Sequence, residues 1–366
     1  MPAIITDQIR VLNASNFVSG IGNASNSYYV FIGLPNATEK ASDWNTSTPS
    51  PIDNFDQHDD IYDTLISAKK INSSDVLRVV SKITWSSGTI YEMYRHDYSI
   101  NKLTPQTSAS NLYNSNYYVM NKDFRVYLCI SNGASPSNGG QGIVSLDEPI
   151  HTDLEPRLES DGYVWKYLYT IKPSDIVKFD SADFIPLPSD WATNTDVADV
   201  RNNAVDGKIE TVVIEDVGSA NYQFTGTKNN VPIKGDGSGA LASVTFIDGK
   251  PSSVQVTNGG SGYSFATLDL DSVVTGAGAS FSVIIPPSGG HGADVYRELG
   301  SNKVLIYSRI ENSDITNPDF PTGNQFARIG IVKNPQVFDS TNILDTPSAS
   351  GLYGLRLTGA ATTTIS

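Results

Sequence analysis

The chain has 366 residues, of which 39% are hydrophobic and 17% are charged. This length and composition predict a globular protein with more than one domain and a sizeable core. The formal net charge of -14 repels phosphate backbones and anionic lipid, which disfavours nucleic acid and membranes as partners. No apolar run approaches the roughly 20 residues of a spanning helix, and the first residues lack a signal-peptide pattern. We therefore expect a soluble protein made in a cytoplasm.

Most of the periodic signal in the chain is two-residue alternation, in short runs rich in Val, Ile, Tyr and Thr, which predicts antiparallel β structure. Tyr28–Leu34 is expected to form a strand that ends at Pro35. Asp59–Lys70 is the clearest helix candidate, because its apolar residues fall on one helical face and its charges complement the helix dipole. Val79–Trp85 and Thr89–Tyr94 are predicted to form a hairpin.

A second hairpin is predicted for Tyr117–Met120 and Phe124–Ile130. The chain's single cysteine, Cys129, lies in its apolar run VYLCI. One cysteine excludes an internal disulfide and a zinc site built from a cysteine pair. We expect Cys129 to be a small core residue rather than a reactive thiol.

Residues 161–171, DGYVWKYLYTI, show the sharpest alternation in the chain. A strand here would direct four aromatic side chains to one side, namely Tyr163, Trp165, Tyr167 and Tyr169. The favoured interpretation is that this aromatic face covers the domain core. The alternative is that part of it is a contact surface, since Tyr and Trp dominate binding hot spots.

Residues 208–287 contain an internal repeat between two connector-like stretches, 186–207 and Pro286–Gly292. Each copy has a Val/Ile-rich triplet, a Gly-Ser pair, a tyrosine and a glycine-rich turn. The segment is therefore predicted to be a small all-β module inserted into a larger domain. Its candidate turn residues are Tyr222, Gly237 and Gly239 with Tyr263, Gly276 and Gly278.

Motifs for catalysis or cofactor binding are weak. None of the four histidines has metal-binding helical spacing. Gly237–Ala242 fits the dinucleotide pattern G-x-G-x-x-A, but a strand pattern follows it where pyrophosphate binding needs a helix. Asp269 and Asp271 leave a weak ion site open. We assign no catalytic, cofactor-binding or metal-binding residue, and we predict no enzymatic activity and no cofactor.

Five segments resemble, in order, the dimeric baseplate wedge family of T-even-like contractile-tailed bacteriophages. The strongest is DGYVWKYLYTIKP, Asp161–Pro173, followed by FIPLPSDW with Pro186, Pro188 and Trp191. Weaker matches are the strand before Trp44, the segment around Trp85, RVYLCISN and Phe326–Pro335. Residues 208–287 look like an insertion into this pattern.

The resemblance implies a structural protein of the virion that is assembled in the host bacterial cytoplasm. It implies a homodimer that joins neighbouring baseplate wedge proteins and moves with them when the tail contracts. The expected fold is mainly β, with a β-sandwich-like core of residues 1–207 plus 288–366, a few short helices and the inserted module 208–287. The candidate structural or interface aromatics are Trp85, Tyr163, Trp165, Tyr167 and Trp191.

Two other functions remain open at the level of sequence. The module could be a receptor- or glycan-binding domain that presents Tyr222 and Tyr263 as aromatic platforms. Packing of these tyrosines over glycine turns is the commoner arrangement. An enzyme that cleaves surface polysaccharide would need two acidic side chains across a cleft, and their separation is set by the fold.

Overall fold

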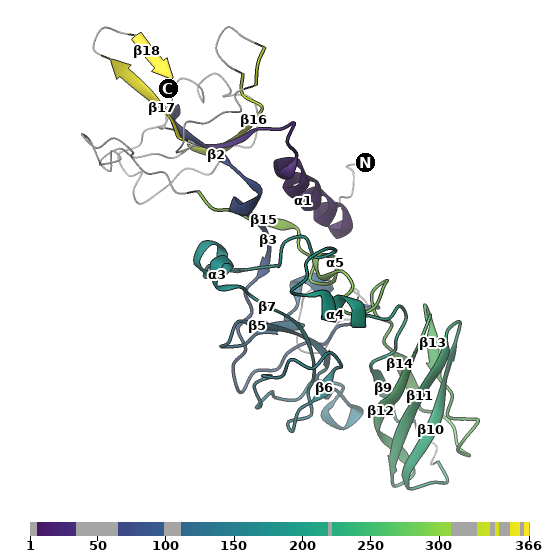
Figure 1. Ribbon diagram of the computed structural model, residues 1–366. Coiled ribbons are helices and arrows are strands. Elements are labelled where there is room, and N and C mark those ends of the chain that lie inside the picture. The colour runs from purple at the N-terminus through teal and green to yellow at the C-terminus, as the bar shows by residue number, and fades with distance from the viewer. Residues whose placement is uncertain are drawn as a thin grey trace, which may run out of the picture. The chain divides into compact units, whose positions relative to one another are not determined.

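The computed structural model describes residues 6–33, 65–98, 111–218, 222–308, 328–336, 341–343, 352–358 and 362–365. Over these residues the chain is mainly β, with several antiparallel sheets and a few short helices (Figure 1). The predicted fold class is therefore confirmed.

The chain divides into two compact units. The larger unit contains residues 1–11 and 78–303, and the smaller unit contains residues 12–77 and 304–366. These bounds differ from the predicted division into 1–207 plus 288–366 and 208–287, because residues 208–287 belong to the larger unit. The predicted domain division stays a prediction.

The smaller unit contains a five-stranded sheet in the order β16-β1-β2-β17-β18. All six residues of β1 (Tyr28–Gly33) are buried, since β1 pairs with β16 on one side and with β2 on the other. The predicted strand at Tyr28–Leu34 is confirmed over residues 28–33. The other elements that lie wholly or mostly in this unit are α1 (Asp7–Gly22), β2 (Leu65–Ile71), η1 (Ser73–Asp75), β16 (Arg328–Lys333), β17 (Leu352–Thr358) and β18 (Thr362–Ile365).

The predicted helix Asp59–Lys70 is wrong over residues 65–70, which belong to strand β2. β2 runs antiparallel to β1, with Tyr28 opposite Ile71 and Phe31 opposite Ala68. Pairing with β1 overrides the local helical pattern, because it gives hydrogen-bond partners to the backbone groups of β1 on the side away from β16. Residues 59–64 lie outside the described residues.

The larger unit is built on a four-stranded sheet in the order β4-β5-β7-β6. The predicted hairpin Tyr117–Ile130 is confirmed as β4 and β5, which pair antiparallel. Cys129 on β5 is fully buried in the core, and burial raises the pKa of its thiol well above the usual value. Outside residues 212–283 its strands are β4 (Tyr118–Met120), β5 (Arg125–Ser131), β6 (Arg157–Leu158), β7 (Val164–Thr170) and β8 (Phe184–Pro186), together with most of β3 (Val76–Ser81). β15 (Lys303–Ile306) begins at the last residue of this unit.

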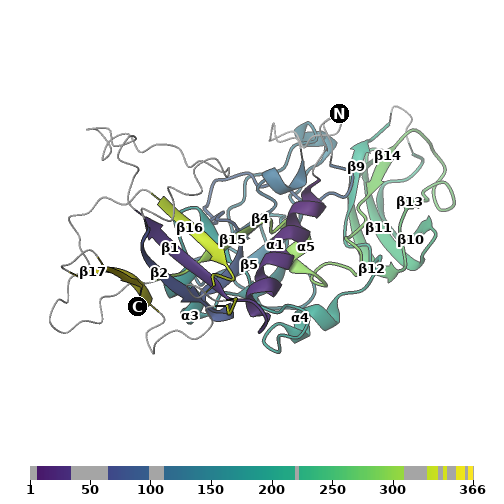
Figure 2. The ribbon, with the colours of Figure 1, turned by 90° about the horizontal axis from the view of Figure 1, so that it is seen from above.

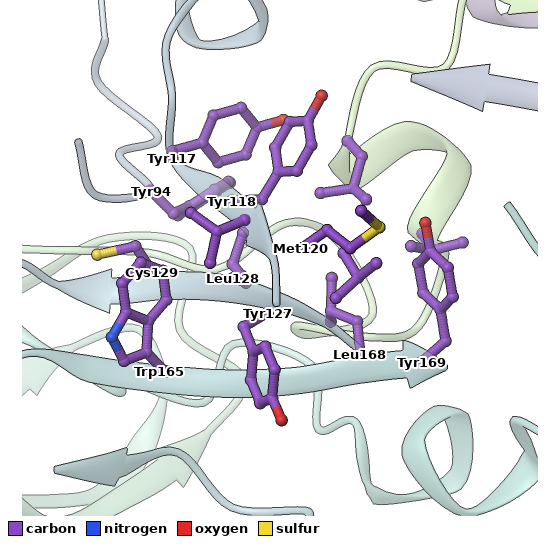
Figure 3. Close-up of a cluster of buried hydrophobic side chains, with 14 of the residues drawn as sticks. Tyr94, Tyr117, Tyr118, Met120, Tyr127, Leu128, Cys129, Trp165, Leu168 and Tyr169 are labelled. Carbon is purple, nitrogen blue, oxygen red and sulfur yellow. The ribbon is translucent and has the colours of Figure 1, made fainter. Parts of the chain in front are cut away.

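The core of the larger unit is rich in aromatic residues. Short helices connect its strands: η2 (Leu112–Asn114), η3 (Pro136–Asn138), α3 (Pro173–Phe179), α4 (Ala198–Asn203) and α5 (Val295–Glu298). Figure 3 draws part of the core, including Tyr117, Tyr118, Met120, Leu128, Trp165, Leu168 and Tyr169.

The predicted hairpin of Val79–Trp85 and Thr89–Tyr94 is wrong. β3 ends at Ser81 and pairs with β8. Thr84 and Thr89 form isolated bridges to distant residues, to Met120 and to Ser145 respectively. Partners far along the chain thus take the backbone groups that a hairpin would have paired with each other.

Strands β9 to β14 all lie within residues 212–283 and are side by side in both views (Figure 1, Figure 2). They form a four-stranded sheet, β12-β11-β10-β13, and a two-stranded sheet, β14-β9, with two small apolar clusters of their own. Their bounds are β9 (Val212–Asp216), β10 (Gly226–Gly235), β11 (Ser238–Ile247), β12 (Lys250–Ser261), β13 (Ala266–Leu268) and β14 (Ser280–Val283).

The two repeat copies are interlocked. The first strand of copy one, β9, pairs with the last strand of copy two, β14. Correspondingly, the first strand of copy two, β12, pairs with the last strand of copy one, β11. The pairing of β10 with β13 also joins the two copies, so of the four strand pairings here only that of β10 with β11 lies within one copy.

Candidate interaction surface

Most of the aromatic strand β7 belongs to the core. Tyr163, Trp165 and Tyr169 are fully buried, whereas Tyr167 is half-buried. The rings of Tyr163 and Trp165 are stacked, with centroids 5.4 Å apart and planes at 10°. These buried rings cannot contact a partner without unfolding the core, which leaves Tyr167 as the one member of the four with accessible surface.

The predicted single aromatic face is interrupted by a β-bulge. Tyr127 on β5 lies opposite Tyr167, and Val126 lies opposite Tyr169, so Leu168 is an extra residue on β7. Neighbouring residues of β5 point to opposite faces, hence Tyr167 and Tyr169 also do. The expectation that all four aromatics share one face is therefore wrong at Tyr169.

The two candidate tryptophans outside β7 have different environments. Trp191 is buried, and its indole Nε1 donates to the carbonyl oxygens of Gly292 (3.2 Å) and Ala293 (3.0 Å). It anchors the segment after β8 to the segment before α5. Trp85 is half-buried and donates from Nε1 to Ser145 Oγ at 3.1 Å.

The two repeat tyrosines pack over the glycine turn of the other copy. A Cβ on Gly237 would lie 2.5 Å from the ring of Tyr263, and one on Gly276 would lie 2.4 Å from the ring of Tyr222. The hydroxyl of Tyr263 accepts from Ala240 N–H, and the hydroxyl of Tyr222 accepts from Ala279 N–H, both at 3.2 Å.

Both tyrosines are only 4% exposed, so neither ring face is open to solvent. Gly239 and Gly278 have positive φ angles, +86° and +103°, which glycine adopts without steric cost. The corresponding Gly260 and Gly218 approach them closely, since a Cβ on either would meet backbone atoms of the opposing turn.

A hollow of about 850 Å³ lies beside β6 and the loop after residue 143. Three of its lining residues are large and apolar yet more than half exposed: Leu146 (60%), Ile150 (57%) and Leu158 (58%). Trp85 also lines it. Trp85 was a candidate from the sequence, whereas the three aliphatic residues were not. Leu146 and Ile150 flank two acidic residues and a proline in the run SLDEPI, and Leu158 lies between Arg157 and Glu159, which were the available signals.

The hollow has an acidic rim. Asp147, Glu148 and Glu159 line it together with a single cation, Arg157. Burial raises the pKa of the Glu159 carboxyl; Arg157 opposes this rise, and the carboxylates of Asp161, Asp147 and Asp153 add to it. Negative charge is thus concentrated at this edge of the sheet.

A second polar cluster lies deep in the larger unit. Lys166 Nζ is 3.3 Å from Glu210 Oε1, with both side chains almost fully buried. His291 contacts Glu298 through Nδ1 at 2.5 Å, while its Nε2 lies 4.0 Å from Glu210. These groups join β7 to the start of the inserted segment and to α5, so the cluster ties elements together.

The weak ion site considered at Asp269 and Asp271 has a local cation. Asp269 forms an ion pair with Lys234, and the ammonium group together with the Ser272 hydroxyl lowers the pKa of that carboxyl. Among the residues that the structure describes, no three His, Cys, Asp or Glu side chains are grouped so that they could hold a metal ion.

No family model matches the chain, and no curated protein matches it. Within the described residues, no helix combines the length and the apolar character required to span a membrane.

Proposed function

We propose that this protein is a structural subunit of a phage tail baseplate wedge. It acts as a homodimer that joins neighbouring wedge proteins and moves with them during tail contraction. It acts by adhesion and makes or breaks no bond. It is assembled in the host bacterial cytoplasm and carried in the virion, without a role for nucleic acid, membrane or cofactor.

The observation that carries this proposal is the exposed apolar hollow on a rigid β scaffold. Leu146, Ile150 and Leu158 are exposed together although large apolar side chains are usually withdrawn from water. Contiguous apolar surface with a polar rim is typical of protein–protein contacts. The ordered resemblance to the wedge family, which includes the segment that forms β7, supplies the class of assembly.

The alternative of a glycan-binding module has less support. Its aromatic platform would require accessible rings at Tyr222 and Tyr263, and these rings are buried against glycine turns. Sugar-binding aromatics need an open ring face, which leaves the alternative without a named binding residue.

Three measurements test the proposal. Sedimentation of the purified chain at micromolar concentration is expected to give a dimer, and mixing it with the other structural proteins of the same particle is expected to give a stable larger complex. Mass spectrometry of isolated tail baseplates is expected to find the chain. A monomer that binds none of these proteins, or absence from the baseplate, would overturn the proposal.

A further inference from the structure

The hollow beside β6 combines apolar side chains with a sheet edge. β6 is the last strand of the order β4-β5-β7-β6, and no further strand pairs with its outer side among the described residues. Leu158 lies on this edge strand, and Leu146 and Ile150 come from the preceding loop. An apolar side chain of a partner could bury itself against these three residues while the partner backbone runs along the edge.

The charges around the hollow define the chemistry of that partner. Three carboxylates, from Asp147, Glu148 and Glu159, face one guanidinium, from Arg157. Counting also the ion-pair partners outside the lining, Lys122 on Glu148 and Asp153 on Arg157, keeps the excess at two negative charges, since this adds one charge of each sign. His151 lies 3.9 Å from Glu159, and burial lowers the pKa of its imidazole, which disfavours a further positive charge there.

The surroundings of Glu159 disfavour the ionised form of its carboxyl when no partner is bound. Its carboxyl lies 3.9 Å from Arg157 Nε, a distance beyond hydrogen bonding. Burial is the main cause that disfavours its ionised form, and the neighbouring carboxylates add to it while Arg157 opposes it. A cation beside the apolar side chain of the partner would relieve this repulsion, so the hollow favours a basic ligand by charge complementarity.

We propose that this hollow is the docking site for a segment of another particle subunit that presents an apolar side chain flanked by lysine or arginine. The inference rests on the proposed function for the class of the partner, a structural subunit. The surface and its chemistry rest on the exposed residues and the acidic rim alone.

The test uses the full chain and a fluorescent extended peptide, KLKVKLK, with fluorescence anisotropy as the readout. The peptide KSKSKSK has the same charge and no apolar side chains, and the peptide ELEVELE has the apolar side chains with the opposite charge. We expect KLKVKLK to bind at least about tenfold more tightly than either control peptide. Comparison with KSKSKSK corrects for non-specific attraction to an acidic protein.

Variants then locate the binding site. The double substitution Ile150→Ser with Leu158→Ser is expected to weaken KLKVKLK binding at least about tenfold. Glu159→Gln is expected to weaken binding and to reduce its salt dependence. Val177→Ser on α3 is a matched control, because Val177 is 83% exposed and lies outside the hollow, and it should change nothing.

Equal binding of KLKVKLK and KSKSKSK, or binding that ignores the Ile150/Leu158 variant, would overturn the inference. Loss of self-association in that variant, with peptide binding unchanged, would show that a second copy of this chain occupies the hollow and would also overturn it. Peptide binding as expected in a chain that is absent from baseplates would leave the surface standing and refute the proposed function.

Discussion

Asp161 shows at the scale of one residue why the DGYVWKYLY segment begins with an acid. Its Oδ1 accepts from Tyr163 N–H (3.0 Å), and its Oδ2 accepts from Leu146 N–H (2.8 Å) and Asp147 N–H (3.0 Å). Burial alone would raise the pKa of this carboxyl, but these hydrogen bonds and one from Ser145 hold it below the usual range. Asp161 therefore fixes the loop that carries Leu146 to the start of β7.

Substituting Asp161→Asn is expected to lower the free energy of unfolding by about 2 kcal/mol. The asparagine side chain has only one acceptor oxygen. Its NH₂ group would therefore point at backbone N–H groups that now donate to the carboxylate, and those hydrogen bonds would be lost. Because the folded-state pKa of Asp161 is lowered, its contribution is present above about pH 4 and is lost as the pH falls below that value.

Urea unfolding of both proteins at about pH 7 and about pH 3 measures this difference. The gap between the two proteins should narrow at the lower pH. A gap of the same size at both pH values would mean that the carboxylate charge has no such role.

At the scale of elements, the repeat module depends on tyrosines that lie over glycine turns. Gly237 has no positive φ, and a Cβ there would be 2.5 Å from both Ser261 O and the Tyr263 ring. Gly239 has φ +86°, yet its Cβ would meet nothing nearer than 3.7 Å. The two glycines of one turn are therefore required for different reasons, close packing and backbone conformation.

Gly237→Ala is expected to destabilise the protein by about 3 kcal/mol, because the methyl group displaces Tyr263 and its hydrogen bonds. Gly239→Ala is the matched control and is expected to cost about 1 kcal/mol of backbone strain. Thermal and urea unfolding measure both. A larger loss for Gly239→Ala than for Gly237→Ala would contradict the packing of Tyr263 over this turn.

A further element-scale prediction concerns the buried pair of Lys166 on β7 and Glu210 before β9. Removing one partner leaves the other charge buried, so Lys166→Met and Glu210→Gln are each expected to cost about 3 kcal/mol. The double variant should lose less than the sum, with a coupling energy of about 2 kcal/mol. Additive losses in this double-mutant cycle would show that the two charges do not stabilise each other.

At the scale of the whole molecule, the residues that precede and follow the segment 208–287 lie next to each other. Gly289 N–H donates to the Asp206 carboxylate at 2.7 Å, and a Cβ on Gly290 would meet the backbone of Val205. Adjacent ends allow a module to be inserted without displacing the elements on either side.

We expect a chain that lacks residues 208–287 to fold and to dimerise. The reason is that the segments whose resemblance implies a dimer, including the one that forms β7, all lie outside the deleted residues. The deletion removes Glu210, so it is combined with Lys166→Met to avoid leaving the Lys166 ammonium group buried without its partner. Sedimentation checks dimerisation, and circular dichroism checks the fold. A folded monomer would assign the dimer contact to the module.

The sequence by itself determined the elements whose signal is local. Buried runs such as YYVFIG and VYLCI are rich in aromatic and β-branched residues, which fit a pleated buried surface, and they form β1 and β5. The core position of Cys129 and of the aromatic strand followed from the same patterns. The repeat was visible because both copies keep the glycines and tyrosines that their turns require.

Only the tertiary structure decided what depends on distant partners. Residues 65–71 became a strand because β1 offered an edge, and Thr84 and Thr89 paired with residues far along the chain. The bulge at Leu168 depends on the register of β7 against β5, and the hollow beside β6 depends on which side chains the folded neighbours leave exposed. Pairing and burial are properties of the folded neighbours, and a local pattern of residues cannot specify which neighbour it will meet.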